Sequence, residues 1–306
     1  MKIRLPRLLS TSIVHFQTVA RLGSVRAAAE SLNVAPSAVS RQVLKLEQDL
    51  GVPLFERLPR GLRLTSAGEI LLYHARSTAG ELERARAAIL ELRGLNRGEA
   101  SLATVESVAL GFLPRLLAGF WGKTPRVAMN VVVTGSTRVF HAVAEGEAEL
   151  GLGFEVPGSP KLKLLASSTL AIGAVMSPKH ALAREKSVRL RDFVGMPIFL
   201  SDMSLTMRPS IEAALRNATV PLSPRVVTNS VHLMNLLAAE NAGVAFETRV
   251  GISREEARGD LVFVPLSEPN LKPQKLKLCC RAEGSLSAAA AALSKALAAA
   301  LDDSGD

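Results

Sequence analysis

Apolar residues in the first part of the chain recur at the spacing of α-helices. Intervals of three and four residues run up to Gly23 and predict a helix that ends there. Ser24 suits the N-cap of a second short helix. Pro36 suits the first turn of a third helix, where its missing N–H needs no partner. The apolar positions of the first helix are Ile13, Phe16, Val19 and Ala20.

The third predicted helix has one apolar and one polar face. Its apolar stripe is Val39, Val43, Leu46 and Leu50. At about 100° per residue, the opposite face carries Ser37, Arg41, Leu44 and Gln48, flanked by Ser40 and Lys45. Arginine can bond guanine, glutamine can pair with adenine, and serine can bond a base or a phosphate. The order of elements predicts a helix-turn-helix that enters a major groove, although periodicity alone leaves an ordinary solvated helix equally open.

A basic β-hairpin is expected directly after this helix. Phe55 is an apolar anchor, and residues 62–64 alternate apolar and basic side chains, as on a half-buried strand. A hairpin in this place is a wing, whose arginines can lie along phosphates. The alternative is a solvated arginine-rich loop, which this order of elements disfavours. The wing arginines are Arg57, Arg60 and Arg63.

A long helix is expected next, capped by Thr65 or Ser66, with Ser66 and Glu69 fitting a capping box. Its apolar positions recur at alternating intervals of four and three residues, which is a heptad seam. So long a seam favours pairing with a second copy of the chain over packing on its own domain. The stretch "GLNRGEAS" then breaks the pattern and predicts a domain boundary. The seam consists of Leu71, Ala75, Thr78, Leu82, Ala85, Ile89 and Leu92.

From about residue 101 the pattern changes to short apolar runs that alternate with helical segments. Examples are "VAMNVVV", "ELGLGF", "MPIFL" and "GVAF". Such alternation predicts parallel α/β layers. No run reaches the roughly 18–20 apolar residues of a membrane span, so no membrane partner is expected.

Charge and cysteine content narrow the partners and the compartment. Of the formal net charge of +9, most lies in residues 1–97, where 15 Lys and Arg face 8 Asp and Glu. Such local basicity points to an anionic polymer as partner. The basic start of the chain lacks the apolar segment of a secretory signal, and the two cysteines give no disulfide framework. A cytoplasmic protein is therefore expected.

An α/β enzyme or a free-standing ligand-binding protein is the alternative to a DNA-binding protein. The five histidines are scattered without zinc-site spacing, and neither a phosphate-binding loop nor a G-x-S-x-G element occurs. The G-x-G in "GLGFEVPG" more often marks a tight turn than a phosphate site. No catalysis, metal or cofactor is expected.

The order helix-turn-helix, wing, long helix and α/β domain resembles the LysR-type transcriptional regulators over essentially the whole chain. The most specific match is the element "AVSRQ…LE…LG…LFER…LT.AG". Weaker but ordered similarity continues in "LPRLLAGF", "AEGEAELGLGF" and "NSVHLMNLLAAENAGVAF". The resemblance implies a regulator of transcription controlled by a small-molecule effector.

The resemblance also implies an α + α/β architecture. A winged helix-turn-helix is expected over residues 1–65, and a linker helix with a hinge over 66–97. A two-lobed domain like a periplasmic binding protein is expected over 98–306, with lobe I at about 98–168 and 269–301, and lobe II at about 169–268. The implied assembly is a homotetramer of two dimers on an interrupted palindrome near a promoter. RNA polymerase is a further candidate partner.

Residues of the second predicted helix, of the third predicted helix (the reading helix) and of the wing are expected to contact DNA. The basic N-terminal residues Lys2, Arg4 and Arg7 either add a phosphate contact or are disordered. The DNA-binding candidates are Val25, Arg26, Pro36, Ser37, Ala38, Ser40, Arg41, Gln42, Lys45, Arg57, Arg60 and Arg63.

In the resembling family the effector lies between the lobes, next to the residues that follow the first two strands of lobe I. Hydroxyl and N–H groups at two helix N-termini favour a small carboxylate there, unless the serines are only helix caps. Glu106 would favour a cationic or neutral ligand if it points inward, and Glu247 and Thr248 are expected near the cleft. The effector-binding candidates are Ser107, Ser136 and Thr137 in lobe I, and Asp202, Met203, Asn229, Ser230 and Phe246 in lobe II.

Overall fold

The computed structural model describes residues 9–58, 61–92, 98–154, 160–218, 223–269 and 271–303. The chain divides into two compact units, residues 1–89 and 90–306. Each unit has its own hydrophobic core. Four basic residues lie outside the described ranges, and the predictions for them stay predictions: Lys2, Arg4, Arg7 and Arg60.

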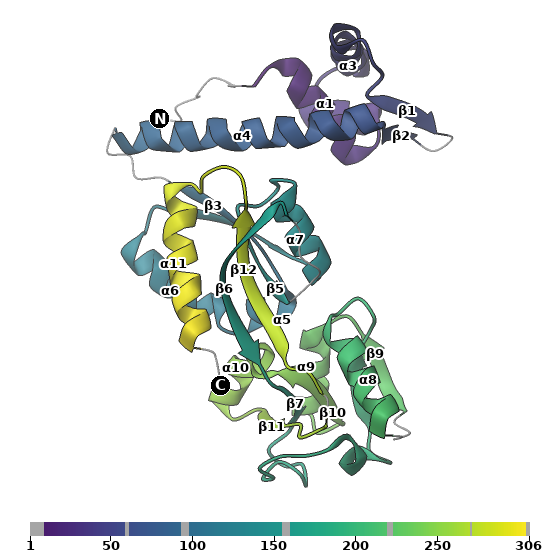
Figure 1. Ribbon diagram of the computed structural model, residues 1–306, viewed down its shortest axis with the longest axis vertical. Coiled ribbons are helices and arrows are strands. Elements are labelled where there is room, and N and C mark those ends of the chain that lie inside the picture. Colours follow the sequence, from purple (N-terminus) through teal and green to yellow (C-terminus); the bar gives the residue numbers. More distant parts are fainter. Residues whose placement is uncertain are drawn as a thin grey trace. The chain divides into compact units, whose positions relative to one another are not determined.

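The first unit contains three short helices, a two-stranded hairpin and a long helix (Figure 1). Its elements are α1 (Thr11–Leu22), α2 (Val25–Leu32), α3 (Pro36–Leu50), β1 (Phe55–Leu58), β2 (Gly61–Leu64) and α4 (Ser66–Leu92). Gly23 ends α1 in the left-handed region, with φ of 64°. Ser24 caps α2 by accepting the N–H of Ala27 at 3.3 Å. The three predicted helices are confirmed.

The core of this unit lies where the apolar stripe of α3 meets α1 and α2. Val39, Val43 and Leu46 of the predicted stripe are buried in it. The prediction that Leu50 continues the stripe is wrong, because Leu50 is 50% exposed. Leu50 is the last residue of α3, and Gly51 turns the chain in the left-handed conformation directly after it.

The predicted wing is confirmed as an antiparallel hairpin of β1 and β2. Two contacts tie it to the helices. One carboxylate oxygen of Glu47 on α3 accepts the N–H groups of Leu54 (2.7 Å) and Phe55 (3.2 Å). The N–H of Leu62 donates to the carbonyl of Gly23 at 2.9 Å. The reading helix and the wing are therefore held together through hydrogen bonds of the wing backbone.

Thr65 is the N-cap of α4. Its hydroxyl accepts the N–H of Gly68 (3.1 Å) and donates to the carbonyl of Pro53 (2.7 Å). The capping box expected between Ser66 and Glu69 is not formed, because the N–H of Glu69 donates to the carbonyl of Thr65. The helix thus begins one residue earlier than a Ser66 cap would require.

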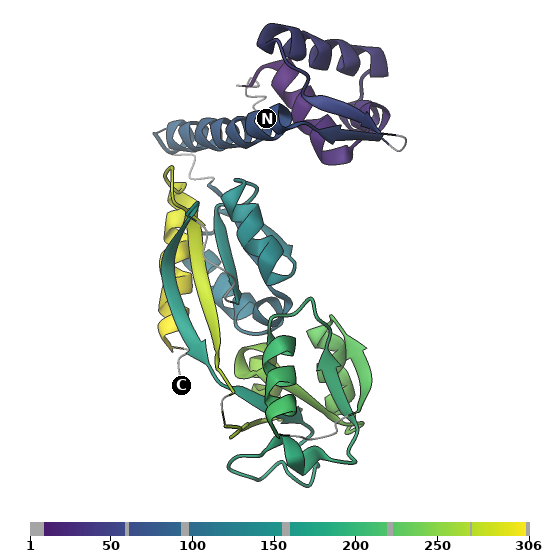
Figure 2. The ribbon, with the colours of Figure 1, turned by 45° about the vertical axis from the view of Figure 1, so that its right-hand side comes forward.

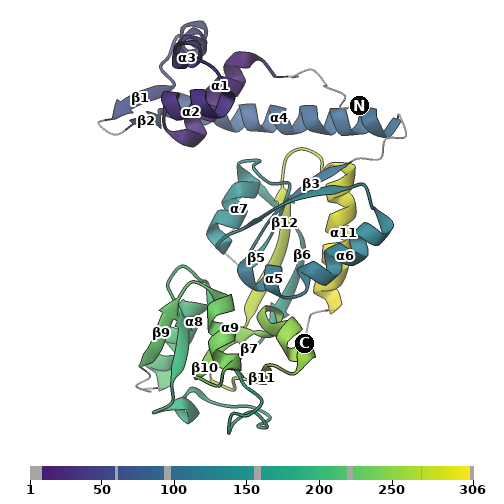
Figure 3. The same cartoon turned by 180° about the vertical axis from the view of Figure 1, so that it is seen from behind.

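The second unit consists of two lobes, each built on a five-stranded sheet (Figures 1 and 3). Lobe I contains β3 (Glu99–Thr104), α5 (Glu106–Leu110), α6 (Leu113–Lys123), β4 (Ala128–Val133), α7 (Ser136–Ala144), β5 (Leu150–Phe154), β6 (Leu162–Leu170), β12 (Gln274–Arg281) and α11 (Ala288–Asp303). Lobe II contains β7 (Ile172–Met176), η1 (Leu190–Phe193), β8 (Ile198–Ser201), α8 (Met207–Ala218), β9 (Pro224–Thr228), α9 (Val231–Ala239), β10 (Val244–Thr248), η2 (Arg249–Ile252), α10 (Ser253–Arg258) and β11 (Val262–Pro265).

Both sheets are mixed. In lobe I the strand order is β4-β3-β5-β12-β6, and β12 runs antiparallel to both neighbours. In lobe II the order is β11-β7-β10-β8-β9, with β7 antiparallel to β10. The predicted parallel layers are therefore correct for β4-β3-β5 and β10-β8-β9 only.

The chain passes between the lobes twice. It leaves lobe I at Ala171, between β6 and β7, and returns between β11 and β12. β6 and β12 pair side by side and lead toward lobe II (Figure 2). The two connections thus lie next to each other, so that lobe II is inserted into lobe I. Within the described residues, no helix is long and apolar enough to cross a membrane.

Candidate DNA interface and effector cavity

The polar face of α3 is open to solvent. Its stripe of buried valines faces α1 and α2, so the opposite side chains point outward. Leu44 is an exposed apolar side chain on this face. Ser37, Arg41, Lys45 and Gln48 are all exposed. The candidates Ala38, Ser40 and Gln42 are half-buried. The structure thus presents the expected mixture of donors and acceptors on one helix.

The other candidates for DNA contact surround this helix. Pro36 begins α3 and is exposed. Val25, at the start of α2, is packed against the core of this unit, and Arg26 next to it forms an ion pair with Glu30 at 3.4 Å. An exposed pair of this kind contributes little stability, so Arg26 can exchange Glu30 for another anion at low cost.

The two described wing arginines differ. Arg57 is exposed and lies opposite Leu62 in the hairpin register. Arg63 lies opposite Glu56, and its guanidinium donates to that carboxylate at 2.5 Å, which raises the pKa of Arg63. Arg63 must therefore leave or share this contact to reach a phosphate, whereas the residue opposite Arg57 is apolar.

The heptad seam of α4 changes character along the helix. Near its start, Ala75 is buried in the first unit, and the neighbouring Leu72 packs with Phe16. Further along, Ala85 is exposed and Ile89 is 55% exposed. The side chain of Leu92 lies outside the described residues. The later half of the seam therefore presents apolar residues that the first unit does not cover.

A cavity of about 400 Å³ lies between the two lobes of the second unit. It is found where the carboxyl ends of parallel strands from both sheets meet, which is the usual ligand position in α/β folds. Its walls are Val105, Glu106, Ser107, Val133, Thr134, Gly135, Ser136, Phe154, Ser201, Ser204, Leu205, Thr206, Met207, Asn229, Ser230, Val231 and Glu247.

Four of the predicted effector-binding residues line this cavity. They are Ser107, Ser136, Asn229 and Ser230. The alternative that Ser107 and Ser136 are helix caps is wrong, since the caps of α5 and α7 are Val105 and Gly135. The buried Ser136 hydroxyl instead accepts the N–H of Phe154 at 3.1 Å, which ties the start of α7 to the end of β5.

Glu106 connects the two lobes across the cavity. Its carboxylate accepts the hydroxyl of Ser230 (3.1 Å), the N–H of Val231 (2.7 Å) and, at 3.5 Å, the N–H of His232. These groups form the N-terminus of α9, where a negative charge is favoured. The position that an anionic effector would take at this helix is thus occupied by a side chain of lobe I.

Glu247 is the second carboxyl group in the cavity wall. It lies on β10 and is only 2% exposed. Burial and, to a lesser extent, the charge of Glu106 raise the pKa of Glu247 to about 8, while the N–H of Thr248 acts in the opposite direction. Glu247 is therefore mostly protonated at neutral pH. Thr248 itself is buried but does not line the cavity.

Two family models match the chain. Residues 11–69 match the bacterial regulatory helix-turn-helix protein of the lysR family, and residues 93–302 match the LysR substrate binding domain. The chain is a LysR-family regulator. This membership assigns the protein to transcription regulation rather than to catalysis, and members of the family bind DNA and oligomerise.

Curated relatives and solved structures agree with this assignment. The regulator is 28% identical over 262 residues to a probable RuBisCO transcriptional regulator of Emiliania huxleyi, covering 84% of this chain and 83% of the relative. Among solved structures, a full-length variant of OxyR from Pseudomonas aeruginosa matches with a TM-score of 0.65 at 19% identity, over 98% and 95% of the chains. CbnR complexed with its target DNA matches with a TM-score of 0.61 at 21% identity, over 95% and 98%. These distant structures support the fold.

The other four predicted effector-binding residues of the regulator do not line the cavity. Thr137 is exposed, and Met203 is 65% exposed. Phe246 belongs to the core of lobe II and packs against Phe193, with ring centroids 5.4 Å apart. Alternate residues of a strand face opposite sides, so burying Phe246 in this core directs Glu247 away from it, toward the cavity.

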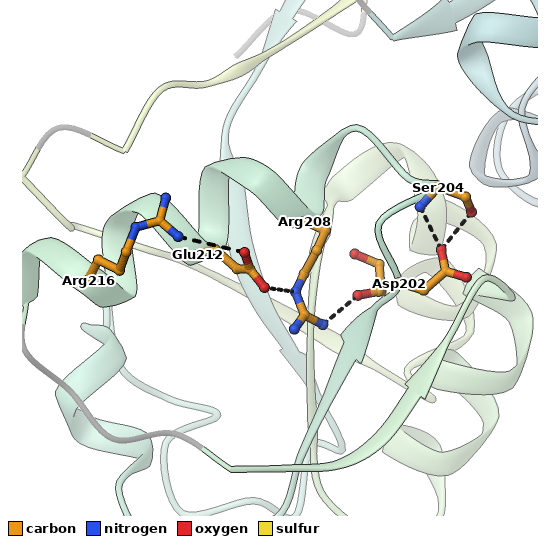
Figure 4. A network of polar contacts seen from close by, with 6 residues as sticks. Asp202, Ser204, Arg208, Glu212 and Arg216 are labelled. Carbon is orange, nitrogen blue, oxygen red and sulfur yellow. Dashed lines mark hydrogen bonds and ion pairs between the residues drawn. The ribbon is translucent and has the colours of Figure 1, made fainter.

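Asp202 stabilises the turn after β8 instead of lining the cavity. Its carboxylate accepts both the N–H (2.8 Å) and the hydroxyl (2.6 Å) of Ser204, which lowers the pKa of Asp202 (Figure 4). This turn brings Ser204, rather than Asp202, to the cavity wall.

Arg208, at the start of α8, also stabilises the loop between β8 and α8. Its guanidinium donates to the carbonyl of Ser201 (2.7 Å) and to Glu212 (2.9 Å), which also contacts Arg216 at 3.7 Å (Figure 4). Sequence reasoning did not identify Ser201. The rule that ligands bind at the carboxyl ends of parallel strands would have found it, since it ends β8.

Proposed function

We propose that the regulator reads double-stranded promoter DNA with α3 in the major groove and the wing along the phosphates. The observation that carries this proposal is the outward polar face of α3, where Ser37, Arg41 and Gln48 stand on one side of a single helix. Arginine and glutamine make bidentate bonds to guanine and adenine in a major groove. The exposed Arg57 of the wing suits a phosphate, which fixes position without reading sequence.

The regulator acts as a homodimer through α4, and two dimers form the tetramer that the family resemblance implies. Support comes from the later half of the seam, where Ala85 and Ile89 are apolar and exposed in the single chain. A heptad seam is covered when a second helix packs against it. Because its target is chromosomal DNA, the regulator works in the cytoplasm, with RNA polymerase as a further partner at activated promoters.

A small molecule in the inter-lobe cavity controls the regulator. A cavity of about 400 Å³, whose walls combine apolar side chains with converging hydroxyl and carboxyl groups, has the size and position of a small-molecule site. Because its walls come from both lobes, a ligand there changes how the lobes are held against each other. QuiR, a distant structural relative at 14% identity with a TM-score of 0.56, was solved with shikimate in its effector binding domain.

Selection from random DNA duplexes tests this function. The full chain should enrich an interrupted palindrome, with half-sites spaced by whole helical turns. Arg41→Ala should change the enriched sequence, whereas the control Arg254→Ala, on α10 of lobe II, should not. Failure of the wild-type chain to enrich any sequence would overturn the proposed function.

A further inference from the structure

The charged side chains that line the inter-lobe cavity, among the residues that the structure describes, are all acidic. Its polar wall consists of two carboxyl groups, of Glu106 and Glu247, seven hydroxyl groups and the amide of Asn229. Among the described residues that line it, none is Lys, Arg or His. An anionic effector would therefore meet acidic side chains and no side-chain cation.

Glu106 also excludes an anion from the place most suited to it. The N-terminus of α9 already binds the Glu106 carboxylate through Ser230 and Val231. An anion arriving from solution would have to displace this internal carboxylate and then lie beside it. A carboxylate can accept about four hydrogen bonds, so Glu106 retains capacity for a donor on a ligand.

Glu247 supplies an independent sign of a ligand. Its carboxyl lies in the cavity wall, although the residue is only 2% exposed, and no described side chain donates a hydrogen bond to it. The backbone N–H of Thr248 bonds to this carboxyl, but burying an acid away from water is costly unless its remaining hydrogen-bonding capacity is also used.

We propose that the cavity selects a small organic cation, whose ammonium or guanidinium group binds between the carboxyl groups of Glu106 and Glu247. The inference rests on the proposed function, because it names the class of effector for that cavity. Hydroxyls of Ser107, Ser136 and Ser204 surround the remainder of the ligand. Hydrogen bonds between a cation and a carboxylate are roughly twice as strong as neutral ones, so charge gives the selectivity.

Binding of a cation also releases a proton near neutral pH. Glu247 is mostly protonated at neutral pH and ionises when a cation is placed beside it. Of the elements packed against β10, α9 carries the exposed His232, and η2 carries Arg249, which pairs with Glu256. β7 and β8 contribute no titratable side chain. Helix α5, which packs against α9 and η2, carries Glu106. A cation that does not titrate itself should therefore bind more tightly as the pH rises from about 6 to about 8.5.

The test uses three probes of similar size on the full chain: butylguanidinium, its neutral analogue butylurea, and pentanoate. Calorimetry at about pH 8.5 should show butylguanidinium bound at least roughly tenfold more tightly than butylurea, and no binding of pentanoate. Titrations in two buffers of different ionisation enthalpy should show proton release near pH 7. Glu247→Gln should lose about tenfold in affinity and the pH dependence, and the control Glu240→Gln on the surface should lose neither.

Three results would overturn the inference. They are pentanoate binding as tightly as butylguanidinium, no binding of butylguanidinium at millimolar concentration, and unchanged affinity in both Glu106→Gln and Glu247→Gln. If Glu247→Gln does not fold, the wild-type proton release and Glu106→Gln decide alone. The DNA selection is run in parallel. If the chain still enriches a palindrome while any of these three results is found, the cationic effector is rejected and the proposed function is retained.

Discussion

The reading face of α3 and the inter-lobe cavity are built in opposite ways. The face on α3 comes from one continuous helix, and its side chains are separated from the core by the helix itself. The cavity is assembled from six strand ends in two lobes, and two of its residues, Glu106 and Ser230, are 124 positions apart and yet hydrogen-bonded. On the face of α3, single residues can be substituted without disturbing the core. A substitution in the cavity wall alters packing, charge and the contact between the lobes together.

The largest expected effect concerns the buried acid of the cavity. Glu247 has a pKa of about 8 in the folded protein, against an ordinary value of 4.5 when unfolded. The folded state then binds more protons between these values, so the stability from this group falls as the pH rises from about 4.5 to about 8. The loss is at most about 1.4 kcal/mol per pH unit. Urea unfolding from about pH 5 to about pH 9 should show this slope in wild type and a flatter one in Glu247→Gln.

Assembly is the next largest effect. Ile89→Glu and Leu82→Glu each place a charge in the seam, where a second helix would bury it at roughly 3–5 kcal/mol. Light scattering should show the dimer split and palindrome binding lost with it, because half-site spacing depends on two paired domains. Ser77→Glu, which adds the same charge beside the seam, should leave the oligomer intact. An intact oligomer for both seam variants would reject α4 as the interface.

A smaller effect is expected on the reading face. Arg41→Ala should cost roughly 1–3 kcal/mol of specific binding, because a bidentate contact to a base is lost. Fluorescence anisotropy on the selected palindrome and on scrambled DNA separates base reading from general attraction. Equal losses on the two duplexes would remove Arg41 from base reading.

The smallest effect is expected at the wing. Arg57→Ala should weaken binding to all sequences alike and reduce the salt slope by about one unit, as loss of one phosphate contact does. Arg63→Ala should have less effect, because Arg63 already pairs with Glu56 in the unbound protein. A change in the preferred sequence after Arg57→Ala would contradict a contact to phosphate alone.

Local patterns predicted the first unit well because its elements are specified by neighbours in the chain. Gly23, Ser24 and Pro36 mark helix ends through their own backbone and hydrogen-bonding chemistry, and the structure places them there. The failures were also local. Leu50 fits the apolar period but lies at the helix end, and the cap of α4 belongs to Thr65, whose hydroxyl is tied to Pro53.

The cavity was predicted only in part, because it depends on which of two neighbouring residues turns inward near each strand end. Ser107 and Ser136 follow strand ends and were identified, whereas Thr137, Met203 and Phe246 each lie one position from a residue that lines the cavity. For Phe246 on β10, a shift of one residue reverses the face of the strand. Thr137 lies in the first turn of α7 and Met203 in the turn after β8, where the neighbouring serine reaches the cavity instead. The contact of Glu106 with α9 joins segments far apart in sequence, and the sequence could not predict it. The sequence predicted only that an inward-pointing Glu106 would favour a cationic or neutral ligand.

The insertion of lobe II into lobe I also has a consequence for synthesis. All five strands of lobe II lie between Ile172 and Pro265, so its sheet can be completed while the C-terminal residues are still being translated. The sheet of lobe I is completed later, because β12 lies between β5 and β6 in it. β12 and α11 are among the last elements to be synthesised. Until then the edges of β5 and β6 are unpaired, and such edges promote association between chains. A nascent regulator is therefore most exposed to misassembly in the interval between the synthesis of Leu170, which ends β6, and that of Arg281, which ends β12.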